Sequence, residues 1–263
     1  MDNSDKTRER LSGSELERYA RHIVLRDVGG SGQQKLKSAR VLVVGAGGLG
    51  SPVLQYLSAA GVGTIGIIDN DVVSLSNLQR QLIHDTDKVG MLKTQSAASA
   101  IKRINPHTKV EQWPIRMDEK NAYALMSCYD VVADGSDNFD TRFLTAETCE
   151  MLNVPLIYAA VGQFDGTVTT LKPFEFDNQG DQLPALRDLF PVKPTPGTVP
   201  TCQEAGVMGV LTGIVGTIQA QEVIKEIVGF GENLTGRLLM IDAKSMRFET
   251  IIYKRGTVSP PAN

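Results

Sequence analysis

A short apolar stretch that leads directly into a glycine-rich turn constrains the fold of this chain more than any other feature. Four apolar residues at 41–44 indicate a buried parallel strand, and Gly45, Gly47 and Gly50 follow in G-x-G-x-x-G spacing. In such a pattern the first glycine permits a tight turn. The second lets the backbone approach a phosphate, and the third lets helix and strand pack closely. The segment from Ser51 predicts a helix whose first amides and dipole favour an anion.

A second apolar strand, at 64–68, ends in an acid that completes this pattern. Asp69 follows Gly50 by nineteen residues, where a carboxylate can bind ribose hydroxyls. Strand, helix and acid together predict a nucleotide site. The glycine pattern alone favours NAD or FAD, and glycines after a strand can also serve packing only.

The segment after Asp69 is unusual for a dinucleotide enzyme, because it carries Asp71, Asn77, Arg80 and then Lys93. NAD has about two phosphate charges, whereas ATP has about four, and phosphoryl chemistry adds fixed cations and a metal. Arg80 and Lys93 can supply the cations, and Asp69 or Asp71 can help with the metal. Taken singly, each residue fits a solvated charged loop or a helix surface equally well. Taken as a set, they favour ATP.

At this point the sequence resembles a known family. The segment Gly-Ala-Gly-Gly-Leu-Gly at 45–50, followed by Asp-x-Asp-x-Val-x-x-Ser-Asn-Leu-x-Arg-Gln at 69–81, is similar to the ubiquitin-activating-enzyme-like adenylyltransferases of the MoeB/ThiF/HesA type, above all to their MoeB-like members. The resemblance extends from Arg18 to about Lys254, and the second motif is highly specific. It implies an α/β fold with a Rossmann-like doubly wound mixed sheet, in which a parallel nucleotide-binding half is joined to antiparallel C-terminal strands.

The pattern of elements predicts one adenylyltransferase-like domain at 12–255, between a flexible N-terminal tail at 1–11 and a C-terminal tail at 256–263. Residues 173–201 hold six of the twelve prolines and predict a long crossover loop. Ser14 and Glu17 indicate a capping box that opens a helix, and the glycine-rich residues 29–34 are expected to form a loop. Residues 206–228 predict a long apolar helix that is buried or at an interface.

Composition excludes several classes of function. The chain has 263 residues, of which 41% are hydrophobic and 22% charged, as in ordinary soluble domains. A formal net charge of −3 gives no reason to expect a nucleic acid or an anionic membrane as partner. The polar start and the lack of an 18-residue apolar run make the cytoplasm the expected location. Three cysteines without a C-x-x-C pair indicate neither a disulfide framework nor a structural zinc site.

The resemblance assigns roles to individual residues. Asp69 is expected to bind the ribose, and Asn77, Arg80 and Lys93 to contact phosphates. Asp137, the second acid of the loop Asp134-Gly-Ser-Asp137, is expected to hold Mg²⁺; a polar loop with an N-cap acid is the alternative. The whole implied ATP-binding set is Gly45, Gly47, Gly48, Gly50, Asp69, Asp71, Asn77, Arg80 and Lys93.

The expected role of Arg21 depends on the resemblance. It lies off the apolar stripe of the predicted N-terminal helix, so the pattern alone indicates ordinary solvation. In the family, the matching arginine reaches the ATP phosphates of the partner subunit. Arg21 is therefore expected to act in trans, which implies a homodimer, and the implied catalytic set is Arg21, Arg80, Lys93 and Asp137.

Two further expectations concern cysteine. Cys202 matches a family cysteine that in some members joins covalently to the carrier protein, and a following helix can lower a thiol's pKa; an unreactive loop thiol is the alternative. Family members commonly bind zinc through two C-x-x-C pairs. The corresponding regions here, 183–188 and 256–261, contain no cysteine, so we expect no zinc. No rhodanese-like segment is recognised, so sulfur is expected from a separate cysteine desulfurase or rhodanese-like protein.

The implied reaction is adenylation of a small ubiquitin-fold sulfur carrier, MoaD-like or ThiS-like, that ends in Gly-Gly. Its C-terminal carboxylate would attack the α-phosphorus of ATP and release pyrophosphate, for molybdopterin or thiamin biosynthesis. A terminal carboxylate has a pKa of about 3.5 and needs no general base, which suits a chain with three scattered histidines. The alternatives are an NAD(P)-dependent Rossmann oxidoreductase and a non-catalytic binding module of the same fold.

Overall fold

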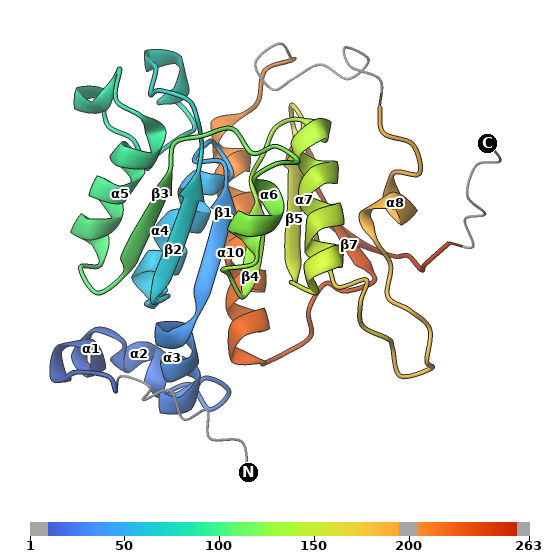
Figure 1. The fold of residues 1–263 in the computed structure, drawn as a ribbon, viewed down its shortest axis with the longest axis horizontal. Coiled ribbons are helices and arrows are strands. Elements are labelled where there is room, and N and C mark those ends of the chain that lie inside the picture. Colours follow the sequence, from blue (N-terminus) through green and yellow to red (C-terminus); the bar gives the residue numbers. More distant parts are fainter. Residues whose placement is uncertain (1–9, 195–204, 257–263) are drawn as a thin grey trace.

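One mixed sheet runs through the part of the chain that the structure, a computed structural model, describes: residues 10–194 and 205–256. Within this part the sheet has eight strands in the order β3-β2-β1-β4-β5-β6-β7-β8 (Figure 1). The strands are β1 (Arg40–Val44), β2 (Thr64–Ile68), β3 (Lys109–Trp113), β4 (Val131–Asp134), β5 (Leu156–Val161), β6 (Asp165–Leu171), β7 (Arg237–Asp242) and β8 (Arg247–Ile252).

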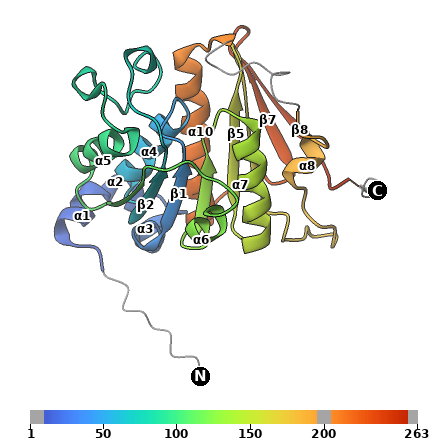
Figure 2. The ribbon, with the colours of Figure 1, turned by 45° about the horizontal axis from the view of Figure 1, so that its top comes forward.

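The direction of strand pairing changes from parallel to antiparallel across the sheet. Strands β3, β2, β1, β4 and β5 pair in parallel, whereas β6, β7 and β8 add to them antiparallel. Figure 2 shows β7 and β8 on the far side of β5 from β1. The predicted doubly wound mixed sheet, with a parallel half and antiparallel C-terminal strands, is confirmed.

Helices cover both faces of the parallel half (Figure 1). One face packs against α4 (Gly50–Ala60), α5 (Lys93–Ile104) and α10 (Gly209–Val228), and the other against α6 (Ala122–Met126) and α7 (Phe139–Leu152). Alternate side chains of β1 divide between the two cores: Val41 and Val43 join one, Leu42 and Val44 the other. The remaining helical segments are α1 (Gly13–Arg18), α2 (Ala20–Ile23), α3 (Gly29–Ser38), α8 (Leu186–Leu189) and the 3₁₀ turns η1 (Leu75–Asn77) and η2 (Thr86–Lys88).

The order of the strands creates a crevice between β1 and β4. The chain leaves β1 toward β2 and β3 on one side, and later continues from β4 toward β5 on the other. Loops that follow two such strands diverge, and ligands of open α/β sheets bind at this switch point. The glycine loop after β1 and the acidic loop after β4 meet here, since a Cβ atom on Gly45 would lie 3.1 Å from the Gly135 carbonyl oxygen.

The N-terminal helix begins earlier than predicted. Ser12, not Ser14, is the N-cap of α1: its Oγ accepts from the Glu15 N–H at 3.3 Å, and the Glu15 carboxylate accepts from the Ser12 N–H at 2.8 Å. The same carboxylate binds Lys37 Nζ at 2.8 Å. Ser12 with Glu15 and Ser14 with Glu17 have the same spacing in the sequence. The pair whose carboxylate also binds a lysine, Ser12 with Glu15, forms the capping box.

The prediction of a loop at 29–34 is wrong, because these residues open helix α3. A Cβ atom on Gly32 would lie 2.8 Å from a methyl group of Val228 on α10. The glycine therefore permits close packing of two helices, and this packing stabilises α3 despite its low intrinsic helix propensity.

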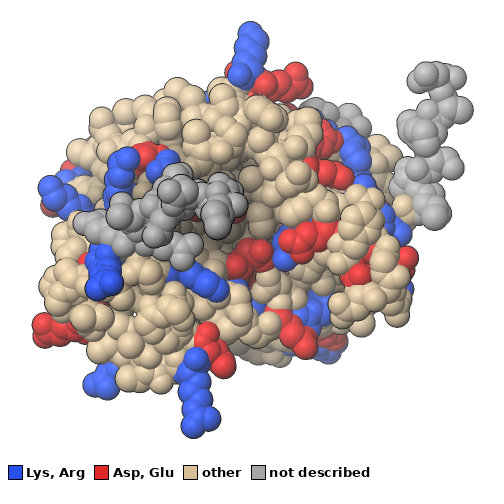
Figure 3. All heavy atoms as spheres, turned by 60° about the horizontal axis from the view of Figure 1, so that its bottom comes forward, with Lys and Arg blue, Asp and Glu red and all other residues tan. Residues whose placement is uncertain are grey.

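The long C-terminal helix α10 begins three residues later than predicted and packs across the sheet. No helix in the described ranges is long and apolar enough to cross a membrane. On the face that Figure 3 shows, acidic and basic side chains are interspersed.

Two segments that are distant in sequence meet beside α7, and this contact is called the C-terminal clasp below. Arg255 donates from Nη1 to the Leu183 carbonyl at 3.3 Å and from Nη2 to Glu150 at 3.2 Å, and the Gly256 N–H donates to Asp188 Oδ1 at 2.7 Å. Segment 183–188 is one of the two regions where the resemblance would place zinc ligands, and Gly256 begins the other. Of the predicted tails and crossover loop, residues 1–9, 195–201 and 257–263 lie outside the described residues, as does Cys202.

Candidate functional site

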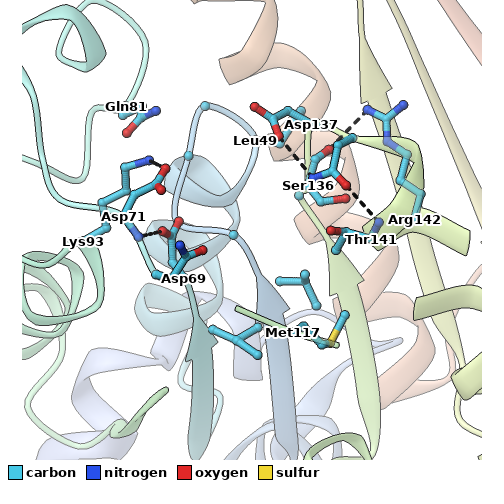
Figure 4. A pocket seen from close by; sticks show the side chains of 18 of the residues that line it. Leu49, Asp69, Asp71, Gln81, Lys93, Met117, Ser136, Asp137, Thr141 and Arg142 are labelled. Carbon is cyan, nitrogen blue, oxygen red and sulfur yellow. Dashed lines mark hydrogen bonds and ion pairs between the residues drawn. The ribbon is translucent and has the colours of Figure 1, made fainter. Parts of the chain in front are cut away.

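A polar cavity of about 400 Å³ lies at the carboxyl ends of β1, β2 and β4 (Figure 4). It is lined by the glycine loop, the segments that follow β2, β3 and β4, the start of α5 and part of α10. Most residues expected to bind ATP or metal from the sequence line it together: Gly45, Gly47, Gly48, Asp69, Asp71, Arg80, Lys93 and Asp137. The folding of the chain thus gathers residues that are more than ninety positions apart in sequence.

The glycine loop has the geometry that its spacing predicts. Gly45 has φ +89°, a left-handed conformation that favours glycine. A Cβ atom on Gly50 would lie 1.9 Å from the Gly45 carbonyl oxygen, so only glycine allows α4 to start this close to β1. At Gly47 the nearest atom to such a Cβ is Gln81 Nε2 at 3.7 Å, so its backbone lies open to the cavity.

Ala46, between these glycines, is held from two sides. Asp69 Oδ2 accepts from its N–H at 2.8 Å, while Asp69 Oδ1 accepts from the Asp71 N–H at 2.9 Å. His84 Nε2 lies 2.9 Å from the Ala46 carbonyl oxygen, and His84 Nδ1 lies 2.9 Å from Ser96 Oγ. Because a carbonyl only accepts, Nε2 must carry the proton. Burial lowers the pKa of His84, so the ring is neutral at pH 7.

Two cations face the cavity on the β2 side. Lys93, the first residue of α5, is 6% exposed, and its Nζ lies 2.8 Å from Asp71 Oδ2 (Figure 4). Arg80 is half-buried and donates from Nη1 to the Ser76 carbonyl at 3.1 Å. Asn77, by contrast, does not line the cavity. Its Oδ1 accepts from the Ser74 N–H at 3.1 Å and caps η1, so its phosphate contact stays a prediction.

The opposite wall is formed by the loop after β4 and the start of α7. Asn138, not Asp137, caps α7, because its Oδ1 accepts from the Thr141 N–H at 2.9 Å. The exposed Asp137 side chain is therefore available to the cavity (Figure 4). In the described ranges, no group of three or more His, Cys, Asp and Glu side chains could hold a metal ion. A magnesium ion at Asp137 would thus need substrate oxygens as further ligands, which is how Mg²⁺ commonly binds.

Sequence reasoning missed three parts of the site. His84 appeared only as a scattered histidine. Ile68, Ile115 and Met117 add an apolar patch to the lining beyond β2 and β3, and Arg142 adds a buried cation on α7. The signal for Arg142 was present, because it lies in the first turns of a helix that follows an acidic loop, much as Lys93 begins α5.

Arg21 does not line the cavity of its own chain. It is exposed on α2, and Figure 1 shows α2 below the amino end of β1, at the opposite end of the sheet from the glycine loop. Arg21 therefore takes no part in the cavity of its own chain, and its role in trans stays a prediction.

Three known proteins are similar in sequence to most of this chain. The SAMP-activating enzyme E1 of Haloferax volcanii is 47% identical over 250 residues, which are 95% of this chain and 90% of the relative. The sulfur carrier protein adenylyltransferase of Thermus thermophilus is 44% identical over 251 residues, which are 95% of this chain and 92% of the relative. The probable adenylyltransferase/sulfurtransferase MoeZ of Mycobacterium tuberculosis is 45% identical over 250 residues; these are 95% of this chain but only 63% of the longer relative.

A solved structure shows the same fold. MccB of E. coli, crystallised with succinimide, matches with a TM-score of 0.77 and 22% identity over 92% of this chain and 73% of MccB. Residues 19–257 match the sequence profile of the ThiF family. With this match, the relatives and the geometry of the cavity, the chain belongs to the ThiF family.

Proposed function

We propose that the protein adenylates the C-terminal glycine carboxylate of a small ubiquitin-fold sulfur carrier that ends in Gly-Gly, using ATP and releasing pyrophosphate. One observation carries the proposal: Lys93 and Arg80 face the same cavity as the glycine loop, with Asp137 on the opposite wall. A dinucleotide site does not need this set of fixed charges. The names of the relatives, which include a sulfur carrier protein adenylyltransferase, support the same activity.

The chemistry requires positioning and charge rather than proton transfer. The attacking carboxylate is ionised at neutral pH, because a terminal carboxyl has a pKa of about 3.5. One of its oxygens forms a bond to the α-phosphorus while the bond to pyrophosphate breaks. Lys93 and Arg80 offset the charge that develops on the departing oxygens. The glycine-loop amides bind phosphate, and Asp69 contributes a carboxylate oxygen to the ribose.

The residues present fit Mg²⁺ as a cofactor. Asp137 would hold the ion together with phosphate oxygens, and the ion would reduce the negative charge that the attacking carboxylate meets. Zinc is proposed to be absent, since segments 183–188 and 256–261 lack cysteine. Cys202 lies outside the described residues, and a covalent link between its thiol and the carrier stays a prediction.

The active unit is proposed to be a homodimer in which Arg21 of each subunit serves the site of the other. The carrier would be MoaD-like or ThiS-like and would serve molybdopterin or thiamin biosynthesis. The sulfur would come from a separate cysteine desulfurase or rhodanese-like protein. The proposed location is the cytoplasm.

ATP–pyrophosphate exchange tests the proposal directly. Purified protein and Mg²⁺ are incubated with labelled pyrophosphate and a panel of carriers that end in Gly-Gly, each with a matched carrier that lacks the last glycine. We expect exchange only with an intact cognate carrier. Absence of exchange with every carrier, alongside clear binding of NAD, would show that the glycine loop serves an oxidoreductase instead.

A further inference from the structure

Arg142 is a buried cation whose hydrogen-bonding capacity is largely unused within the described chain. It lies on α7, is 7% exposed and lines the cavity. Nη2 donates to the Ser136 carbonyl at 3.2 Å, whereas Nε is buried without a partner. The guanidinium carbon lies 5.2 Å from the ring centre of Phe139 and 5.7 Å from that of Tyr158. Both rings lie within cation–π distance of the guanidinium.

The protein provides only partial compensation for this charge. Within residues 10–194 and 205–256 no ion pair joins Arg142 to a carboxylate. Burial raises the pKa of the fully buried Asp134 carboxyl, and the nearby charge of Arg142 lowers that pKa only in part. Asp134 Oδ2 also lacks a hydrogen-bond partner. A buried cation is costly unless it is paired and hydrogen-bonded, so the open side of Arg142 suits an anion in the cavity.

A second unused donor lies on the same wall. Ser136 is 9% exposed, lines the cavity, and its Oγ has no partner. Its N–H donates to Asp134 Oδ1 at 2.9 Å, which fixes the loop that carries the hydroxyl. The cavity wall between β4 and α7 therefore offers two donors that have no hydrogen-bond partner in the described chain, Arg142 Nε and Ser136 Oγ.

This wall lies across the glycine loop from Lys93 and Asp69. Figure 4 shows Ser136, Asp137 and Arg142 on one side of the glycine loop and Asp69, Asp71 and Lys93 on the other. The acid that suits ribose and the lysine that suits phosphates both belong to the β2 side. Asp137, the expected magnesium ligand, shares the wall of Arg142, so an anion at Arg142 would lie where the second substrate meets the metal-bound phosphates.

We propose that Arg142, assisted by Ser136 Oγ, binds the terminal carboxylate of the carrier protein and presents it to the α-phosphorus. This inference rests on the proposed function. A planar guanidinium matches a carboxylate, and it can hold one oxygen while the other attacks. When the new carbon–oxygen–phosphorus link forms and pyrophosphate leaves, the carboxyl group loses its charge. Arg142 then binds the adenylated product more weakly than the substrate.

A phosphate group of ATP is also an oxyanion that Arg142 could bind. Replacing the terminal carboxylate of the carrier by a neutral carboxamide distinguishes the carrier from ATP as the ligand of Arg142. The cognate carrier is prepared with its natural carboxylate and with a C-terminal carboxamide. Affinity for each is measured by calorimetry with α,β-methylene-ATP present, so that no reaction occurs. We expect the wild-type protein to prefer the carboxylate by about tenfold to one hundredfold, as for hydrogen bonds to charged groups.

Substitution of Arg142 then tests the assignment. Arg142→Gln should bind both carriers equally while its affinity for α,β-methylene-ATP stays that of the wild type. Arg142→Lys keeps the charge but loses the planar fork, so we expect an intermediate preference. Arg116→Gln removes another cation from the same cavity and serves as the matched control, with the carboxylate preference retained.

Two results would overturn the inference. If Arg142→Gln loses nucleotide affinity and keeps the carboxylate preference, Arg142 binds phosphate. If both affinities stay unchanged and only the melting temperature falls, Arg142 serves structure. Should Arg142→Gln fail to fold, the preference of the Arg142→Lys variant for the carboxylate decides.

Carrier-dependent exchange by the wild-type protein is measured alongside. Absence of this exchange would reject the proposed function. Exchange by the wild type, together with an unchanged carboxylate preference in the Arg142 variants, would reject this inference alone.

Discussion

His84 links the glycine loop to the helix that carries Lys93. Its Nε2–H donates to the Ala46 carbonyl, and its Nδ1 accepts from Ser96 on α5. The ring is 5% exposed and neutral, so it acts through hydrogen-bond geometry rather than charge. We interpret His84 as a residue that positions the phosphate-binding loop without touching the substrate.

Two amide substitutions separate its two hydrogen bonds. The side-chain amide introduced by His84→Gln can replace Nε2–H toward Ala46, whereas the shorter side chain of His84→Asn can replace only Nδ1. We expect His84→Asn to raise the KM for ATP in the exchange reaction by about twofold to tenfold, the value of one hydrogen bond, with His84→Gln close to wild type. Equal KM values in the two variants would remove the positioning role.

Lys93 is the residue on which the expected phosphate chemistry depends most. Removal of one preorganised charge of this kind costs about a hundredfold or more in rate, so Lys93→Gln should lose at least this much exchange activity. Lys102→Gln removes an exposed lysine from the same helix and should retain activity. Exchange by Lys93→Gln at the rate of the Lys102→Gln control would contradict the phosphate role.

Residue types and spacing were sufficient to predict which side chains gather at the cavity where the motifs are contiguous. Gly45, Asp69, Arg80 and Lys93 could be named because each follows a recognisable element. His84 could not, because its importance comes from burial and from partners on other elements. Such contacts have no signature in a single sequence.

Glycine contacts set the distances between elements at both ends of the sheet. A Cβ atom would lie 1.9 Å from the Gly45 carbonyl oxygen if placed on Gly50, and 1.8 Å from the Lys37 carbonyl oxygen if placed on Gly63. The first contact joins β1 to α4 at the cavity. The second joins the turn before β2 to the end of α3, away from it.

These two glycines form a matched pair for mutation. Alanine at either position forces the backbone to move, so Gly50→Ala and Gly63→Ala should each lower the free energy of unfolding by about 1–3 kcal/mol. Only Gly50→Ala should also weaken the affinity for ATP of the folded protein. Urea unfolding and calorimetric titration provide the two measurements, and a similar loss of ATP affinity in Gly63→Ala would contradict the local role of Gly50.

A polar cluster joins β3 to the amino end of β1 and to Tyr129, which lies just before β4. Glu111 on β3 binds Arg40 Nη2 at 2.8 Å and Lys109 Nζ at 2.9 Å, and it accepts from the Tyr129 hydroxyl at 2.9 Å. Burial raises the pKa of Glu111, but the hydrogen bonds from Lys109 and Tyr129 and the charge of Arg40 outweigh it, so the pKa is lowered. The carboxylate therefore stabilises the fold only where it is ionised.

The pH dependence of unfolding tests this cluster. Because the folded pKa lies below the unfolded one, the stabilisation is fully present above the unfolded value of about 4.3 and is lost as the pH falls through the folded value. Glu111→Gln should lower the free energy of unfolding by about 1 kcal/mol at pH 7. The difference from wild type should shrink below pH of about 4. A difference that is constant from pH 7 to pH 3 would show that the charge does not contribute.

The elements themselves were largely predictable, and the errors have physical causes. The apolar runs of β1 and β2 and the helix with Asn138 at its start were located correctly. The glycine-rich segment 29–34 was not, because packing of Gly32 against Val228 overrides low helix propensity. The N-cap at Ser12 was displaced because Lys37, which is distant in sequence, selects Glu15 as the capping acid.

At the scale of the whole molecule, α2, which carries the exposed Arg21, lies at the opposite end of the sheet from the glycine loop. If each subunit lends Arg21 to its partner, two inactive variants should complement each other. In a mixture of Arg21→Ala and Lys93→Gln, a mixed dimer has one site with both native residues and one with neither. Random re-assembly of equal amounts should restore about one quarter of wild-type exchange.

Each variant alone is the control for this experiment. Arg21→Ala is expected to keep its fold and its dimer while losing most activity, as measured by melting temperature, light scattering and exchange. If the mixture remains inactive although mixed dimers form, Arg21 does not act in trans.

The C-terminal clasp has a consequence for how the molecule responds to its surroundings. Arg255, Asp188 and Glu150 join the two segments through ionic and backbone hydrogen bonds. Contacts of this kind form without delivery of a metal and are unaffected by chelators or by oxidation of thiols. They are weakened by dissolved ions, since exposed charges are screened within about 8 Å at physiological ionic strength. We therefore expect the attachment of this end of the chain to loosen as the salt concentration rises.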